Sequence, residues 1–527
     1  MADTNDNLAL TIGQWPRTLL TGRCIGIEKE TLRMGADGAI AKTPHPVALG
    51  SALSHPYITT DYSEALLELI TPPLATPEEV LHCLASVHRF VYQHMDSQEL
   101  LWGASMPCVM DGEEAIPVAY YGDSHQGRMK HIYRRGLGHR YGKRMQIIAG
   151  IHFNFSLPEA LWRHFQAVTG DRRDLQTVIT DGYFRLIRNQ QRLGWLLLYL
   201  FGCSPAVCKS FLRDRSDHQL QEFDATTLYA PHATSLRMSD LGYTNKNKAR
   251  AEAQVSISYN SLEEYVAGLR TATETPYAEY QRIGIQVNGE YRQLNDNILQ
   301  IENEFYGTIR PKQGLEPGEK PTNALSRRGV GYVELRSLDV DLLEPVGIGP
   351  SQLRFLESFL LYCLWAPDPP IDTVETAEIQ DNVLNTALRG REPGLALRRQ
   401  GQTVSLRQWG REILTAMEPV CELLDGNEAG APYRAALAAQ LACVEEPALT
   451  PSARTLAGMR EAEEGFFHFA KRQSLTHREH FLGLTAEEHW APLLAAEVEQ
   501  SRARQRELEA AARASSFEDF LARYFAQ

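Results

Sequence analysis

The chain lacks the patterns that define several large protein classes. Its eight cysteines lie far apart and include no C-x-x-C pair, which argues against a zinc ribbon or a dense disulfide framework. The most apolar stretch, residues 193–203, is too short to cross a bilayer and predicts a buried helix. The polar, acidic start of the chain does not resemble a signal peptide. We therefore expect a cytoplasmic protein that does not bind membranes.

Charge and missing motifs exclude further classes. A formal net charge of −13 argues against a broad nucleic-acid surface, although a local basic pocket for phosphates is compatible with it. The chain has no G-x-x-x-x-G-K-[ST] phosphate loop, no G-x-G-x-x-G after a strand, no G-x-S-x-G and no H-E-x-x-H. These absences disfavour common nucleotide hydrolases, dehydrogenases, serine hydrolases and zinc proteases.

What is present indicates an α+β fold. In the first two thirds, strand-like segments are joined by long and varied connections, which favours a mostly antiparallel sheet with helices packed behind it. Beyond about residue 370 the pattern becomes helical and rich in alanine. We expect residues 1–370 to form the core that carries the sheet and residues 371–527 to form a helical part of the same globular unit.

Local signals place several elements. Capping boxes predict helices that begin after Thr76 and Ser261, where Glu79 and Glu264 lie three residues further on. Pattern and length predict other helices over 172–201, 352–364 and 491–512, strands over 146–156 and 299–310, and a long loop over 311–331. The charge-laced helix 491–512 either lies solvated on a monomer, which we favour, or docks a partner.

Acidic side chains share one face of several strand-like segments, because alternate strand residues point the same way. Glu28 and Glu30 point away from Ile25 and Ile27. The other groups in phase are Glu64 with Glu68; Glu334 with Arg336; Glu302 and Glu304 with Tyr306 and Arg310; and Gln146 with His152 and Asn154. Two carboxylates about 5 Å apart repel by roughly 3 kcal/mol at an effective dielectric near 20, so bound divalent cations are expected among them.

Hard oxygen ligands of this kind suit magnesium or manganese, which bridge the phosphates of a nucleotide. Arg336 is placed to steady charge on a transferring phosphoryl group, and its alternative role is a salt bridge that only neutralises Glu334. His152 taken alone is more often a core histidine than a metal ligand. ATP phosphates are expected near Arg310, Lys312 and Arg336.

Six ordered blocks of sequence resemble bacterial glutamate–cysteine ligase. They are 26–33, 58–72, 150–156, 233–245, 300–306 and 333–339, and beyond about residue 370 the similarity is thin. The resemblance implies a glutamine-synthetase-like catalytic sheet that holds three magnesium ions, and it changes the interpretation of His152 from a core residue to a ligand.

The resemblance also implies the residues of the site. The metal ligands are Glu28, Glu30, Asp61, Glu68, His152 and Glu334; glutamate binds Arg237, Gln146 and Asn154; cysteine binds near Tyr62, Tyr133, Arg134, Leu137, Tyr243 and Tyr306; and Arg336 and Glu334 are catalytic. Metal contact by Glu64, Glu302 and Glu304 remains open. Tyr62 departs from the family, which has phenylalanine at this position, and its hydroxyl needs a partner if it is buried.

The implied reaction joins the γ-carboxylate of L-glutamate to the amine of L-cysteine with ATP as co-substrate, through a γ-glutamyl phosphate, as the first step of glutathione synthesis. The small-molecule partners are then glutamate, cysteine and ATP, and feedback binding of glutathione to a monomeric enzyme is expected. Two alternatives remain: a related ligase with another amine acceptor, and a catalytically inactive sensor of metabolites.

Overall fold

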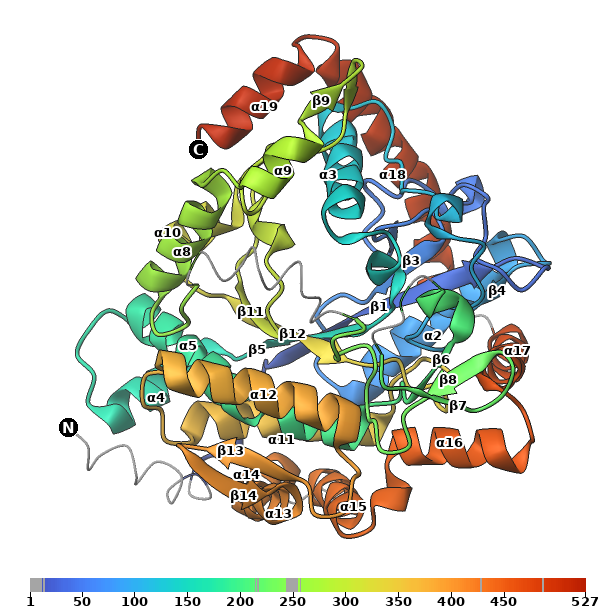
Figure 1. Ribbon diagram of the computed structural model, residues 1–527. Coiled ribbons are helices and arrows are strands. Elements are labelled where there is room, and N and C mark those ends of the chain that lie inside the picture. The colour runs from blue at the N-terminus through green and yellow to red at the C-terminus, as the bar shows by residue number, and fades with distance from the viewer. Residues whose placement is uncertain are drawn as a thin grey trace.

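A seven-stranded sheet lies at the centre of the molecule (Figure 1). The computed structural model describes residues 12, 15–213, 215, 218–242, 255, 257–426, 429–485 and 488–527. The strands follow the order β11-β12-β5-β1-β3-β2, β4 pairs with β1 off this path, and every pair is antiparallel. The expected α+β class is confirmed. The strands are β1 (Cys24–Met34), β2 (Ile58–Thr60), β3 (Leu66–Ile70), β4 (Leu100–Leu101), β5 (Ile151–Ser156), β11 (Ile309–Lys312) and β12 (Tyr332–Leu338).

Helices cover the apolar face of this sheet. Ile25, Ile27, Phe153, Phe155 and Leu335 alternate with the polar residues of their strands and are fully buried in the main core. The helices of the first part are α2 (Pro77–His94), α3 (His125–Tyr141), α4 (Glu159–Thr169), α5 (Leu175–Leu193), α6 (Trp195–Phe201), α8 (Leu262–Glu274), α9 (Ala278–Ile283), α10 (Pro321–Arg328) and α11 (Pro350–Trp365). Three small strands, β6 (Ala206–Cys208), β7 (Gln221–Glu222) and β8 (Thr227–Tyr229), form a separate sheet, and β9 (Gln286–Val287) pairs with β10 (Glu290–Tyr291).

The capping signals mark true helix starts. Thr76 Oγ1 accepts a hydrogen bond from Glu79 N, and the Glu79 carboxylate accepts one from Thr76 N, so the capping box of α2 is complete. Ser261 Oγ accepts a bond from Glu264 N at the start of α8. A cap of this kind contributes about 1 kcal/mol. The helix expected over 172–201 is instead two helices, α5 and α6, which meet at Gly194.

Two expectations on the chain between residues 299 and 331 were wrong. Residues 302–304 form a short 3-10 helix, and the strand begins only at Ile309. Glu302 accepts a hydrogen bond from Thr322 N and Glu304 accepts one from Gln300 N, so neither lines a strand. The expected loop 311–331 contains the end of β11 and all of α10, which starts with Pro321 in its first turn. The strand expected from residue 146 begins at Ile151, after another 3-10 turn, η5 (Met145–Ile147).

The part beyond residue 370 packs on the sheet-bearing part. Its helices are α12 (Thr373–Arg389), α13 (Leu406–Ala416), α14 (Glu418–Asp425), α15 (Pro432–Glu445), α16 (Pro451–Glu461), α17 (Phe466–Gly483), α18 (Trp490–Ala512) and α19 (Phe517–Phe525), and it also contains an unexpected hairpin of β13 (Ala396–Arg399) and β14 (Gln402–Ser405). Both parts contribute to one continuous hydrophobic core.

The long helix α18 is held by its own chain. It runs beside α2 and α3 (Figure 1). Ser501 Oγ accepts a hydrogen bond from Ser51 N, and Arg504 donates to the carbonyl of Ser54. The helix expected over 491–512 is therefore present as one long helix that packs along one side and is partly solvated on the other. Within the described residues, no helix combines the length and the apolar character needed to cross a membrane.

Candidate functional site

Three strands bring two carboxylates and an imidazole together. Glu28 on β1 lies opposite His152 on β5, and Glu334 on β12 lies opposite Asn154 on the same β5. One ligand atom each from Glu28, His152 and Glu334 lies within 4.8 Å of the others, and within the described part of the chain this is the one group of its kind. The cluster depends on β5 lying between β1 and β12, which local sequence does not reveal.

Hydrogen bonds orient the cluster. His152 Nδ1 lies 3.1 Å from Glu28 Oε2, and Asn154 Nδ2 donates to Glu28 Oε1 at 2.9 Å. Burial alone would raise the pKa of the Glu334 carboxyl, but Lys312 and Arg336 outweigh burial and hold that pKa well below its usual range. Glu334 is therefore ionised at neutral pH, as a metal ligand must be.

A second acidic group adjoins the first. Glu30 on β1 pairs directly with Glu68 on β3, and Asp61 lies in the turn between β2 and β3. Burial, followed by the charges of Glu28 and Asp61, raises the pKa of Glu68 well above its usual range. Burial likewise raises the pKa of Glu30. Such crowded acids are costly to ionise unless cations neutralise them.

Three other in-phase carboxylates are used inside the protein. Both oxygens of Glu64 accept backbone N–H groups at 2.6 Å, from His45 and Tyr120. The remaining two, Glu302 and Glu304, accept bonds respectively from Thr322 and from Arg140, Tyr141 and Gln300. All three carboxylates are therefore engaged by hydrogen-bond donors of the protein itself.

Cations border the cluster on the β11–β12 side. Arg336 Nη1 donates to Glu334 Oε2 at 2.9 Å, and Lys312 Nζ donates to Glu334 Oε1 at 3.1 Å. The Nε atom of Arg336 is buried and has no partner within the described residues. Arg310, by contrast, donates to the backbone carbonyls of Asn303 and Phe305.

Arg237 lies on the other side of Arg336. Its Nη2 donates to the Arg336 carbonyl at 2.9 Å, and only 1% of Arg237 is exposed. The guanidinium lies against Gly150, where an added Cβ would be 2.1 Å from Nη2. Gln146, the second residue expected to bind glutamate, lies half-buried in η5, and the third, Asn154, donates its side-chain amide to Glu28. Gly150 was not assigned a role from the sequence in making room for the Arg237 guanidinium. The sequence feature that could have indicated it is a glycine among bulky residues of the expected strand.

The residues expected to bind the amine acceptor gather around α3. Tyr133, Arg134 and Leu137 lie on this helix, and Arg134 is tied to Asp61 through a bond to its carbonyl and a 3.8 Å ion pair. Tyr306 Oη donates to Met238 Sδ at 3.3 Å, which places it beside the Arg237 segment. Tyr243 lies outside the described residues.

Tyr62 carries a buried hydroxyl that has no hydrogen-bond partner within the described residues. The residue is 1% exposed, and α3 passes over it at Gly138, where a Cβ would lie 2.4 Å from the Tyr62 oxygen. We predict that Tyr62→Phe raises the free energy of unfolding by about 1–2 kcal/mol, because it removes an unsatisfied polar group. Urea unfolding measures the change.

Tyr121→Phe is the matched control for this prediction. The Tyr121 hydroxyl donates to the carbonyls of Thr60 and Asp61, both at 2.8 Å, so its loss is expected to destabilise the protein. A stability loss of equal size in both variants would show that the Tyr62 hydroxyl is also satisfied.

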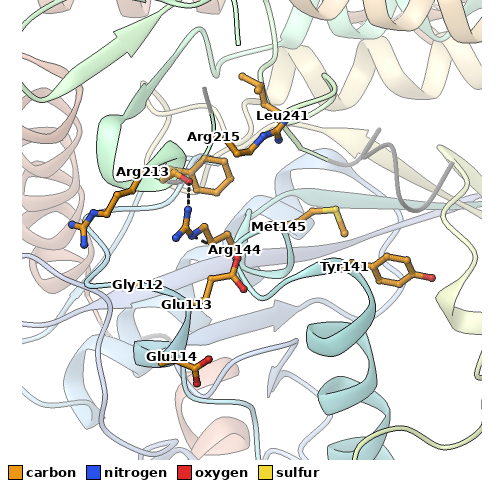
Figure 2. A pocket seen from close by; sticks show the side chains of 10 residues that line it. Gly112, Glu113, Glu114, Tyr141, Arg144, Met145, Arg213, Arg215 and Leu241 are labelled. Carbon is orange, nitrogen blue, oxygen red and sulfur yellow. Dashed lines mark hydrogen bonds and ion pairs between the residues drawn. The ribbon is translucent and has the colours of Figure 1, made fainter. Parts of the chain in front are cut away.

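A cavity of about 570 Å³ opens where α3 ends (Figure 2). Arg144 crosses it, donating to the Phe211 carbonyl at 3.4 Å and lying 3.6 Å from Glu113. Its other lining residues are Gly112, Glu114, Tyr141, Met145, Arg213, Arg215 and Leu241. Met145 directly precedes Gln146, but none of the three residues expected to bind glutamate lines this cavity.

A sheet face that carries carboxylates and an imidazole, bordered by lysine and arginine, is chemically suited to an enzyme that acts on metal-bound phosphates. Comparisons with known proteins identify the family to which the chain belongs. The family model described as glutamate-cysteine ligase matches residues 11–386. The chain is 49% identical over 511 residues to the glutamate–cysteine ligase of Alcanivorax borkumensis, covering 96% of each, and 51% identical over 517 residues to that of Azotobacter vinelandii, covering 97% and 96%.

Solved structures agree. The Francisella tularensis glutamate–cysteine ligase, crystallised in complex with AMP, matches with a TM-score of 0.89 at 36% identity over 96% of this chain and 97% of that one. A bifunctional glutathione synthetase from Pasteurella multocida shares the fold, with a TM-score of 0.69 at 24% identity over 91% of this chain and 55% of that one. The chain belongs to the glutamate–cysteine ligase family, whose members are ATP-dependent ligases acting in the first step of glutathione biosynthesis. The resemblance identified from the sequence is confirmed.

Proposed function

We propose that the described site joins the γ-carboxylate of L-glutamate to the amine of L-cysteine. The observation that carries this proposal is the meeting of Glu28, His152 and Glu334 on three adjacent strands, with Arg336 bound to Glu334. A carboxylate oxygen is a poor leaving group. One oxygen of the γ-carboxylate therefore first bonds to the γ-phosphorus of ATP as ADP leaves. The neutral cysteine amine then forms the C–N bond to the γ-carbon, its nitrogen gives up one proton, and phosphate leaves with that oxygen.

The donor set fits magnesium, with manganese as a substitute, because carboxylate oxygens are hard ligands. The raised pKa values of Glu30 and Glu68 support the fit, since burial makes these carboxylates costly to ionise without cations. The residues that would hold the ions are Glu28, Glu30, Asp61, Glu68, His152 and Glu334. When bound, magnesium aligns two anions and neutralises the charge that develops between them.

Arg336 and Lys312 supply positive charge on the nucleotide side. Glu334 engages one guanidinium nitrogen of Arg336, so the remaining N–H groups are available to a transferring phosphoryl group. Lys312 acts as a point charge toward the phosphates. Arg310 lies opposite Glu334 in the sheet, although it comes 24 residues earlier in the chain. Its guanidinium donates to backbone carbonyls, so it would act on the phosphates through its charge.

Arg237 is the proposed anchor for the α-carboxylate of glutamate, assisted by Gln146 and Asn154. A guanidinium binds a carboxylate through two parallel hydrogen bonds. Because the side chain is 1% exposed in this structure, the side chains that cover it must move for glutamate to reach it.

Gly150→Ala tests this anchor. The new Cβ would overlap the Arg237 guanidinium, which is the flexible end of a side chain, so the guanidinium moves while the fold is retained. We predict that KM for glutamate rises about 10-fold or more, in line with the cost of a 1 Å misplacement, while the free energy of unfolding changes by less than about 1 kcal/mol.

Gly26→Ala is the matched control, because its Cβ would meet its nearest atoms at 3.7 Å, an ordinary contact. Steady-state kinetics with glutamate as the varied substrate measure both variants. An unchanged KM in Gly150→Ala would contradict the anchor.

Tyr62, Tyr133, Arg134, Leu137, Tyr243 and Tyr306 are proposed to surround the cysteine acceptor. ADP release from ATP and glutamate, measured as cysteine is titrated, tests the acceptor directly. We expect release to depend on cysteine. Full turnover with another amine and none with cysteine would favour the related-ligase alternative, and binding of Mg-ATP without turnover for any amino-acid pair would favour a sensor.

The proposed setting is a cytoplasmic monomer that binds small molecules and no nucleic acid, with feedback binding of glutathione. The acidic net charge of −13 supports the exclusion of nucleic acid.

A further inference from the structure

A buried aspartate lies behind the Arg237 segment. Asp339 follows directly after β12, the strand that carries Glu334 and Arg336, and is 2% exposed. Its carboxylate accepts three hydrogen bonds, from Cys203 N at 2.9 Å, Ser204 Oγ at 2.6 Å and Ser235 Oγ at 2.8 Å. Neither the metal cluster nor the proposed substrate contacts use this residue.

The two serines connect Asp339 to the backbone around Arg237. Ser204 and Ser235 belong to neighbouring segments joined by a parallel bridge. Ser204 Oγ lies 3.4 Å from the backbone N of Arg237, and Ser235 Oγ accepts a 3.2 Å bond from the backbone N of Met238.

The chemistry of the carboxylate sets the direction of these bonds. An ionised carboxylate only accepts hydrogen bonds, so both hydroxyls must donate to Asp339. Their lone pairs are then left to the amides of Arg237 and Met238. An asparagine carries a donor in place of one oxygen, so one serine hydroxyl would have to turn its proton away and accept from the amide, and the charge-assisted bond that fixes that serine would be lost.

The position of this segment decides where the guanidinium lies. Arg237 reaches between the carbonyl of Arg336 and the bare backbone of Gly150. A displacement of about 1 Å in a substrate-binding group costs on the order of 100-fold in rate. We propose that Asp339 is a positioning residue that, through Ser204 and Ser235, holds Arg237 for glutamate; this inference rests on the proposed role of Arg237.

The test compares Asp339→Asn with Asp341→Asn in the full-length chain. Asp341 is also buried, at 8% exposure, but it accepts bonds from Leu343 N and Cys203 Sγ and contacts neither serine. For Asp339→Asn we expect KM for glutamate to rise about 10-fold or more and KM for Mg-ATP to change less than about twofold. Asp341→Asn is expected to change neither value beyond about twofold.

Ser235→Ala provides a second variant in case Asp339→Asn fails to fold. It removes the Ser235 hydroxyl that links Asp339 to the backbone of Met238 and keeps the Asp339 carboxylate, so the same rise in KM for glutamate is expected. An unchanged KM for glutamate in the folded variants, or an equal rise in KM for both substrates, would overturn the inference.

Arg237→Gln distinguishes a failure of the glutamate anchor from a failure of the positioning role of Asp339. If Arg237→Gln leaves KM for glutamate unchanged, the proposed anchor itself fails. If Arg237→Gln raises that KM but Asp339→Asn and Ser235→Ala do not, the anchor stands and the positioning role fails. The double variant Asp339→Asn/Arg237→Gln is expected to be no worse than Arg237→Gln alone, because a residue that acts through Arg237 has nothing left to position.

Discussion

Replacing Glu334 by glutamine is expected to lower kcat by on the order of 10³-fold. Lys312 and Arg336 hold the pKa of this carboxyl well below its usual range, so the substitution removes a charge that is present at neutral pH. It also leaves the side chains of Lys312 and Arg336, which now bind the Glu334 carboxylate, facing a neutral amide. ADP release at saturating ATP, glutamate, cysteine and magnesium measures the loss.

Glu64→Gln is the control for this prediction. Its carboxylate comes from the same acidic set but accepts two backbone N–H groups, so an amide satisfies only one of them. We expect a loss of about 1–3 kcal/mol in the free energy of unfolding with nearly normal turnover. Retention of more than about a tenth of the activity in Glu334→Gln would contradict the role given to the cluster.

Arg336→Lys is expected to lower kcat by on the order of 10³-fold with a small change in KM for ATP. Lysine keeps the charge but lacks the planar fork that can bind Glu334 and a phosphoryl oxygen at the same time. The loss falls on kcat because charge accumulates on the transferring group only in the transition state. Single-turnover measurement of ADP formation separates this step from product release.

Arg192→Lys controls for the general cost of changing an arginine in a partly buried ion pair. Arg192 pairs with Glu375 and Asp368 on the side of α5, and neither partner belongs to the cluster. This variant is expected to lose stability and keep its kcat. Equal losses of kcat in both variants would reduce Arg336 to a structural salt bridge, the alternative that the sequence left open.

Alternation along a strand predicted which residues line the polar face of the sheet. In β1, Ile25 and Ile27 are buried in the core while Glu28 and Glu30 face the site, because a strand that covers a core on one face repeats with a period of two. The caps at Thr76 and Ser261 were also predictable, since they depend on residues only three positions apart.

Features that depend on distant segments were not predictable from local sequence. Glu302 and Glu304 share strand phase with Arg310, yet α10 and α3 supply their hydrogen-bond partners and leave them in a 3-10 turn. Phase alone likewise could not separate Glu64 from Glu68, because the turn over residues 61–65 redirects Glu64 toward two backbone amides. The neighbours of Arg237 depend on Gly150 and Asp339, 87 residues before it and 102 after it.

Oxygen transfer from glutamate to phosphate tests the central claim most directly. Glutamate labelled with ¹⁸O in its γ-carboxylate is incubated with the enzyme, ATP, magnesium and cysteine, and the released phosphate is analysed by mass. If the γ-carboxylate is activated as an acyl phosphate, every peptide bond formed releases one phosphate, and that phosphate carries one labelled oxygen. Peptide formation with unlabelled phosphate would contradict phosphorylation of glutamate at this site.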